Sequence, residues 1–108
     1  MLPISPSQIA EVIILARDMG RSEAEFDGFV CRLAQDEQAG LVAVFWIGRG
    51  SFDVDDLELA IETAASEATI PTEEYLKGSP HLADHLEAGL DALGIDATDV
   101  EDDLYRRA

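Results

Sequence analysis

The sequence predicts an all-α fold, a compact bundle of about five to six short helices. Apolar residues recur at helical spacing along most of the chain. Capping residues precede these stretches, and glycines follow them. The length of 108 residues and the apolar fraction of 47% suit one domain. We therefore expect a single helical domain over residues 1–95 and an acidic C-terminal tail over residues 96–108.

The first expected helix has a complete start signal. Ser5 can cap it, Pro6 suits the first helical position, and Gln8 can return the capping-box bond. Its apolar stripe is Ile9, Val12, Ile13, Ala16 and Met19. Gly20 is expected to end the helix in a left-handed conformation.

A second helix is expected from the capping-box pair Ser22 and Glu25. One of its faces carries Phe26, Phe29, Val30 and Leu33. Cys31 lies on this apolar helix, and we expect it to be a small core residue.

The third expected helix is the central element of the bundle. Asp36 is its expected cap, and the helix runs from about 37 to 48. Residues 41–47 are apolar all round, which is typical of a buried helix and also of a buried strand. The polar, helix-favouring lead-in at 36–39 favours the helix.

The second half of the chain predicts further helices. Gly48-Arg49-Gly50 ends the third, and Ser51 or Asp53 begins the next. The expected inner stripe of that helix is Val54, Leu57, Ala60, Ile61, Ala64 and Ala68. Residues 72–77 form a short helix closed by Gly78.

Ser79-Pro80 is expected to open the last long helix, which Gly94 ends. Its expected inner residues are Leu82, Leu86, Gly89, Leu90 and Leu93. In the tail, Thr98 and Glu101 could cap one more helical turn. A short helix and a disordered tail are both open alternatives there.

Two separated motifs resemble those of an uncharacterised proteobacterial family of unknown function. The first has the pattern W-x-G-R-G-x-F and reads Trp46-Ile47-Gly48-Arg49-Gly50-Ser51-Phe52. The second begins at Thr72-Glu73-Glu74-Tyr75-Leu76-Lys77-Gly78-Ser79-Pro80 and continues through Leu82, Leu86 and Gly89-Leu90. The similarity covers about residues 2–95. Members often carry a longer acidic insertion where this chain has only residues 19–22. The resemblance implies a defined fold and transfers no catalytic residue.

The charge of the chain is strongly negative and unevenly distributed. The formal net charge is −16. Residues 1–50 carry seven acidic and four basic residues, and residues 51–108 carry sixteen and three. This field repels phosphate, so we expect neither direct nucleic-acid binding nor binding to an anionic membrane. It favours a basic protein partner, with simple solubility as the competing explanation.

The compartment expected for this protein is the bacterial cytoplasm. The lone Cys31 cannot form an internal disulfide, which suits reducing conditions. The N-terminus lacks the features of a signal peptide. The apolar run 41–47 is too short to cross a bilayer.

Few residues suggest chemistry. Arg49 follows Trp46 by three positions and could clamp an anion, although pairing with carbonyls at its helix end or with a nearby carboxylate is the favoured interpretation. His81 and His85 would share a helix face, yet a structural zinc site needs four ligands. The acidic clusters lack the glycine of an EF-hand loop. We expect no catalytic residue, metal site or cofactor.

Two functional hypotheses follow. The favoured one is an acidic helical interaction module that binds a basic partner, with nucleic-acid mimicry as a special case. The alternative is a small ligand-binding domain or enzyme with a pocket near Trp46, Arg49, Tyr75, His81 and His85. A homodimer is compatible with either hypothesis, provided that its interface excludes most acidic residues.

Overall fold

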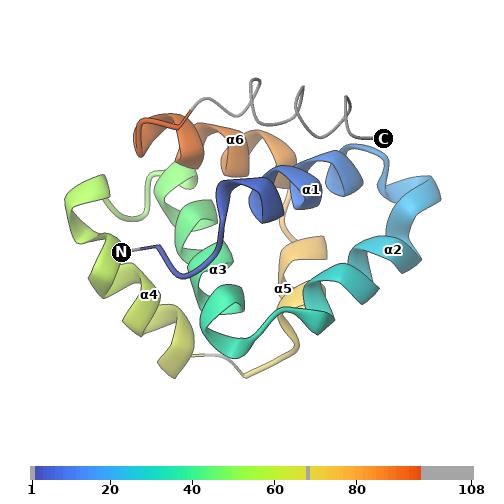
Figure 1. The fold of residues 1–108 in the computed structure, drawn as a ribbon, viewed down its shortest axis with the longest axis horizontal. Coiled ribbons are helices and arrows are strands. Elements are labelled where there is room, and N and C mark those ends of the chain that lie inside the picture. The colour runs from blue at the N-terminus through green and yellow to red at the C-terminus, as the bar shows by residue number, and fades with distance from the viewer. Residues whose placement is uncertain (1, 68, 96–108) are drawn as a thin grey trace.

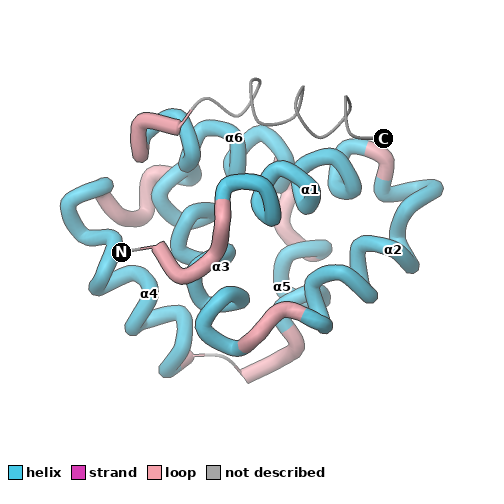
Figure 2. Tube along the Cα trace, in the orientation of Figure 1, coloured by secondary structure: helices cyan, strands magenta, loops and turns pink. Residues whose placement is uncertain are grey.

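The computed structural model describes residues 2–67 and 69–95, and this part of the chain is helical without any strand (Figures 1 and 2). The α-helices are α1 (Pro6–Arg17), α2 (Met19–Arg32), α3 (Gln35–Arg49), α4 (Leu57–Ser66), α5 (Thr72–Lys77) and α6 (Leu82–Ala92). A short 3-10 helix, η1 (Val54–Asp56), precedes α4. The predicted all-α bundle is confirmed. Ala68 and the predicted tail lie outside the described residues.

Helix α3 is the centre of the bundle. It packs against α6, α4 and α5, while α1 packs against α6 and α2, and α2 packs against α5 (Figure 1). In the apolar run 41–47, every residue is buried except Trp46, which is half-buried. The run lies inside α3, which confirms its helical interpretation.

The helix starts are partly as predicted. Ser5 and Gln8 form the reciprocal capping box, with Oγ of Ser5 accepting from N of Gln8 at 3.1 Å and Oε1 of Gln8 accepting from N of Ser5 at 2.9 Å. The predicted start of α3 was wrong by two residues, because Ala34 is the cap and Asp36 lies in the first turn. The Glu37 carboxylate instead accepts from the backbone N of Ala34 at 2.8 Å.

The connection between α1 and α2 differs from the prediction. Helix α1 ends at Arg17, and Asp18 alone separates it from α2. Gly20 therefore lies inside α2 and does not end a helix. The predicted start at Ser22 marks a kink in α2, where φ is −109° and ψ is 15°.

Glycines have two different uses in this fold. Gly50 and Gly94 adopt left-handed conformations, with φ of 90° and 83°, and terminate α3 and α6 as predicted. Gly48 and Gly89 lie at the α3–α6 crossing. A Cβ atom on Gly48 would lie 1.7 Å from the carbonyl oxygen of His85, and one on Gly89 would lie 2.2 Å from that of Val44. The two backbones therefore touch directly.

Two side chains expected inside the fold are exposed. Cys31 is exposed, because α2 buries Phe26 and Val30 and the next position is turned about 100° away from them. Val54 is 39% exposed, since the 3-10 turn precedes the buried part of α4. In the described part of the chain, no helix is long and apolar enough to span a membrane.

Candidate functional site

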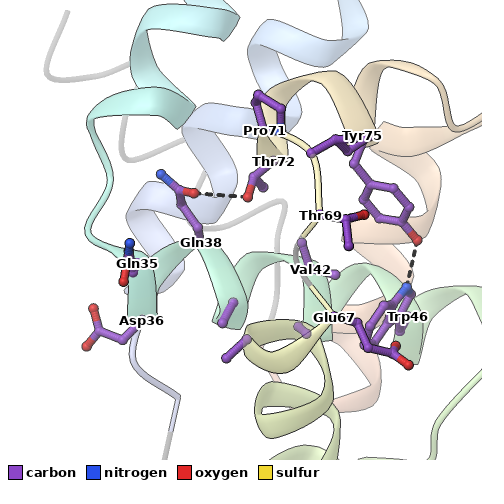
Figure 3. A pocket seen from close by; sticks show the side chains of 14 residues that line it. Gln35, Asp36, Gln38, Val42, Trp46, Glu67, Thr69, Pro71, Thr72 and Tyr75 are labelled. Atoms are coloured by element: carbon purple, nitrogen blue, oxygen red, sulfur yellow. Dashed lines mark hydrogen bonds between the residues drawn. The ribbon is translucent and has the colours of Figure 1, made fainter.

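An open cleft with a volume of about 1010 Å³ lies along one face of α3. Figure 3 shows it from close by. The end of α4 forms one wall, and the 69–71 connection with α5 forms the other. Its lining residues are Gln35, Asp36, Gln38, Ala39, Val42, Trp46, Ala64, Ala65, Glu67, Thr69, Ile70, Pro71, Thr72 and Tyr75.

Small side chains make this cleft. Ala39 and Val42 on α3 and Ala64 on α4 are buried beneath it. At a helix contact, larger residues would fill the space between the two helices. Helix α4 ends at Ser66, and Pro71, which has no backbone N–H, is the cap residue that directly precedes α5.

Trp46 and Tyr75 close one side of the cleft together. The indole Nε1 of Trp46 donates to the Tyr75 hydroxyl at 2.9 Å, which joins α3 to α5 (Figure 3). The Trp46 ring also stacks on Phe52, with ring centroids 5.5 Å apart. The rings of Trp46 and Tyr75 are thus held in fixed orientations at the surface of the bundle.

Gln38 secures the opposite part of the wall. Its Nε2 donates to the carbonyl oxygens of Val30 and Leu33 at 3.2 and 3.0 Å. Its Oε1 accepts from the Thr72 hydroxyl at 2.9 Å (Figure 3). The amide therefore ties the α2–α3 connection to α5, and both its ends are already satisfied.

The electrostatic character of the cleft is negative. Asp36 and Glu67 are exposed carboxylates in its lining, and no Lys, Arg or His among the described residues lines it. Next to the cleft, the pKa of Glu37 is lowered because its carboxylate accepts hydrogen bonds from the backbone of Ala34 and the side chain of Gln8. The cleft thus offers no counter-charge for an anionic ligand.

Arg49 and His85 do not line the cleft. Both pack on the buried ring of Phe45: the Arg49 guanidinium lies 5.0 Å from its centroid, and the His85 ring lies 5.6 Å from it in an edge-to-face arrangement. The Arg49 Nε also donates to the Ser51 hydroxyl at 3.0 Å. Arg49 was expected to pair with a carbonyl or a carboxylate. In the structure it instead makes a cation–π contact with Phe45 and a hydrogen bond to the hydroxyl of Ser51.

His81 lies close to His85 but not within the same helix. It precedes α6 as the N-terminal cap residue, in a left-handed conformation with φ of 58°. Its ring is still 6.4 Å from that of His85. It lines a second, smaller cavity of about 250 Å³ beside Lys77 and Asp84. Over the residues that the structure describes, no group of three or more metal-ligating side chains occurs.

Lys77 is the cation that fastens α5 to α2. Its Nζ lies 2.9 Å from an oxygen of Asp27 and 3.2 Å from one of Glu23. The hydrogen bonds to Asp27 and then Glu23 raise the pKa of the ammonium group. The positive charge of Lys77 is therefore paired with carboxylates of α2.

Of the predicted site residues, Trp46 and Tyr75 therefore line the cleft and are hydrogen-bonded to each other. Arg49, His81 and His85 lie outside its lining. The α4 wall and the Gln38 bridge were missed by sequence reasoning. The interruption at Thr69-Ile70-Pro71 and the small residues Ala39, Ala64 and Ala65 were the available signals.

A family model described as "Protein of unknown function (DUF3775)" matches residues 23–95 of the chain. This range includes α3, α4 and α5, and so the whole described cleft. No curated protein and no solved structure matches the chain.

Proposed function

The chain belongs to the DUF3775 family of unknown function, and we propose that it is an acidic helical interaction module that binds a basic protein. The observation that carries this proposal is the excess of negative charge on η1 and α4 and at their ends. The exposed carboxylates that it rests on are Asp53, Asp55, Asp56, Glu62 and Glu67.

The cations nearest to this segment in sequence are engaged elsewhere. No Lys or Arg occurs between Arg49 and Lys77. Arg49 packs on Phe45 and bonds Ser51, and Lys77 bonds Asp27 and Glu23. A partner rich in Lys and Arg would therefore be attracted to this face, whereas the phosphates of nucleic acid would be repelled. A nucleic-acid-binding protein is one class of such partner.

A charge-neutralisation experiment tests this proposal. The triple variant Asp55→Asn, Asp56→Asn, Glu62→Gln removes two exposed charges from η1 and one from α4 with almost no change in side-chain size. We expect its affinity for a short Lys/Arg-rich peptide to fall about tenfold at low salt, because each exposed charge pair contributes up to about 1 kcal/mol. Fluorescence anisotropy of the labelled peptide measures it.

The matched control removes three exposed or half-buried charges from α1, α2 and the residue between them: Glu11→Gln, Asp18→Asn, Glu25→Gln. It reduces the net negative charge by the same amount and should weaken binding less. Wild-type affinity should also fall between low salt and about 0.2 M salt. An affinity that is constant over this range contradicts the proposal.

The alternative function, a small enzyme or ligand-binding domain, has weaker support. Trp46 and Tyr75 line a cleft of sufficient size. The three ionisable candidates Arg49, His81 and His85 do not line it. A ligand there would meet carboxylates and aromatic rings without a basic group.

A further inference from the structure

We infer that the cleft between α3, α4 and α5 receives an apolar anchor residue of the basic partner, an aromatic or long aliphatic side chain with Lys or Arg beside it in the sequence. This inference rests on the proposed function and adds the docking position and the chemistry of the docked segment. The dimensions, the floor and the charge of the cleft support it separately.

The cleft has the length of a peptide segment. Its lining on α3 extends from Gln35 to Trp46, which corresponds to roughly 16 Å along the helix axis. An extended chain covers this distance with about five residues. The volume of about 1010 Å³ likewise exceeds what one small ion or a single methyl-sized group would occupy.

The floor of the cleft is apolar, and apolar side chains at its wall and rim are exposed. Ala39, Val42 and Ala64 are buried below it, and Ala65 is exposed at its wall. Ile70 at the rim is 51% exposed, so a large apolar side chain contacts solvent here. An incoming aromatic or aliphatic side chain would remove this apolar surface from water, which favours binding.

The polar groups of the cleft select a cationic segment. Asp36 and Glu67 are exposed in its lining, and in the part of the chain that the structure describes no cation lines it beside them. Lys or Arg beside the anchor would complement both, whereas an anionic segment would be repelled. The Tyr75 hydroxyl accepts from Trp46 and has no acceptor for its own hydrogen among the described residues. It can donate to a backbone carbonyl of the segment.

A second copy of the chain fits this cleft less well. A symmetric dimer through it would bring Asp36 and Glu67 of both protomers toward one another. Like charges brought together in an interface oppose association. A foreign basic segment meets no such repulsion.

Trp46 provides a direct reporter, because it is the sole Trp of the chain and lines the cleft. The probe is a short Lys/Arg-rich peptide with a central Phe and no Trp. We expect it to change the Trp46 fluorescence on binding. The same peptide with a central Ala should bind about tenfold or more weakly, since the buried Phe side chain is lost.

Two matched pairs of variants locate the binding. Ala65→Phe fills the cleft from an exposed position, and Ala88→Phe adds the same bulk at an exposed position of α6 outside it. Asp36→Asn with Glu67→Gln neutralises the lining, and Glu25→Gln with Asp91→Asn changes the net charge equally elsewhere. The first member of each pair should lower the affinity for the peptide about tenfold, and the second member less than about twofold.

The outcomes separate this inference from the proposed function. If the peptide binds with salt dependence but Ala65→Phe and the central Ala have no effect and Trp46 fluorescence is constant, the inference is wrong and the proposed function stands. If no cationic peptide binds, both are wrong. If Ala65→Phe abolishes self-association of the free protein, measured by sedimentation, the cleft holds a second copy and the inference is wrong.

Discussion

The two sides of α3 contact their neighbouring helices in different ways. At the α6 side, Gly48 and Gly89 lack side chains, so the backbones touch and no space is left. At the α4 and α5 side, the small side chains Ala39, Ala64 and Ala65 line an open cleft of about 1010 Å³. Small residues thus accompany direct backbone contact on one side of α3 and an open cleft on the other.

Breaking the tight crossing should have the largest effect. Gly48→Ala would place a Cβ atom 1.7 Å from the carbonyl oxygen of His85, so α6 must shift. We expect a loss of about 3 kcal/mol in the free energy of unfolding, the upper range for overpacking. Urea unfolding measures it through the midpoint at constant m-value.

Gly20→Ala is the matched control, because a Cβ atom on Gly20 meets nothing within 4 Å. This substitution lies in helix α2 and should stabilise the protein by about 0.5–1 kcal/mol. If Gly48→Ala lowered the free energy of unfolding no more than Gly20→Ala, the α3–α6 contact would tolerate a side chain and the expectation would be wrong.

The cleft side should respond more mildly to Tyr75→Phe. This variant removes the acceptor for the Trp46 Nε1 and keeps the ring. We expect a loss of about 1 kcal/mol in the free energy of unfolding, typical of one hydrogen bond. A double-mutant cycle with Trp46→Phe should give a coupling energy of similar size. A coupling near zero would mean that this bond does not hold the wall of the cleft.

The attachment of α5 to α2 should weaken at high pH. Folding raises the pKa of Lys77, so the contribution of its ion pairs is complete below the unfolded pKa and disappears as pH rises through the folded pKa. The stability difference between wild type and Lys77→Met should therefore shrink on strong alkalinisation. Thermal melts across that range measure it, and Lys77→Arg, which stays charged, should retain its stability longer. A difference independent of pH would contradict this role.

Salt should produce the smallest change. Screening of the crowded carboxylates should raise the melting temperature between very low and moderate ionic strength. The increase should be smaller in the Asp55→Asn, Asp56→Asn, Glu62→Gln variant. The loss caused by Gly48→Ala should not depend on salt, since the crossing is a steric contact. A melting temperature that is constant or falls with salt would contradict the expectation for the charged face.

Sequence reasoning worked best where local chemistry acts alone. The Ser5–Gln8 capping box and the short helix 72–77 were predicted correctly, because both depend on neighbours within one turn. The exposure of Cys31 was missed, since one residue of helical rotation separates it from the buried Val30. His81 was misplaced because the chain enters α6 through a left-handed residue that no capping signal marks.

The sequence by itself determined the helices, the buried run 41–47 and the excess of carboxylates, because these follow from periodicity, capping and composition. Only the tertiary structure decided that Gly48 meets α6 backbone, that Trp46 bonds Tyr75 and that Arg49 packs on Phe45. These contacts depend on how whole helices are placed relative to one another. That placement is set by packing between residues far apart in the chain, which no local pattern records.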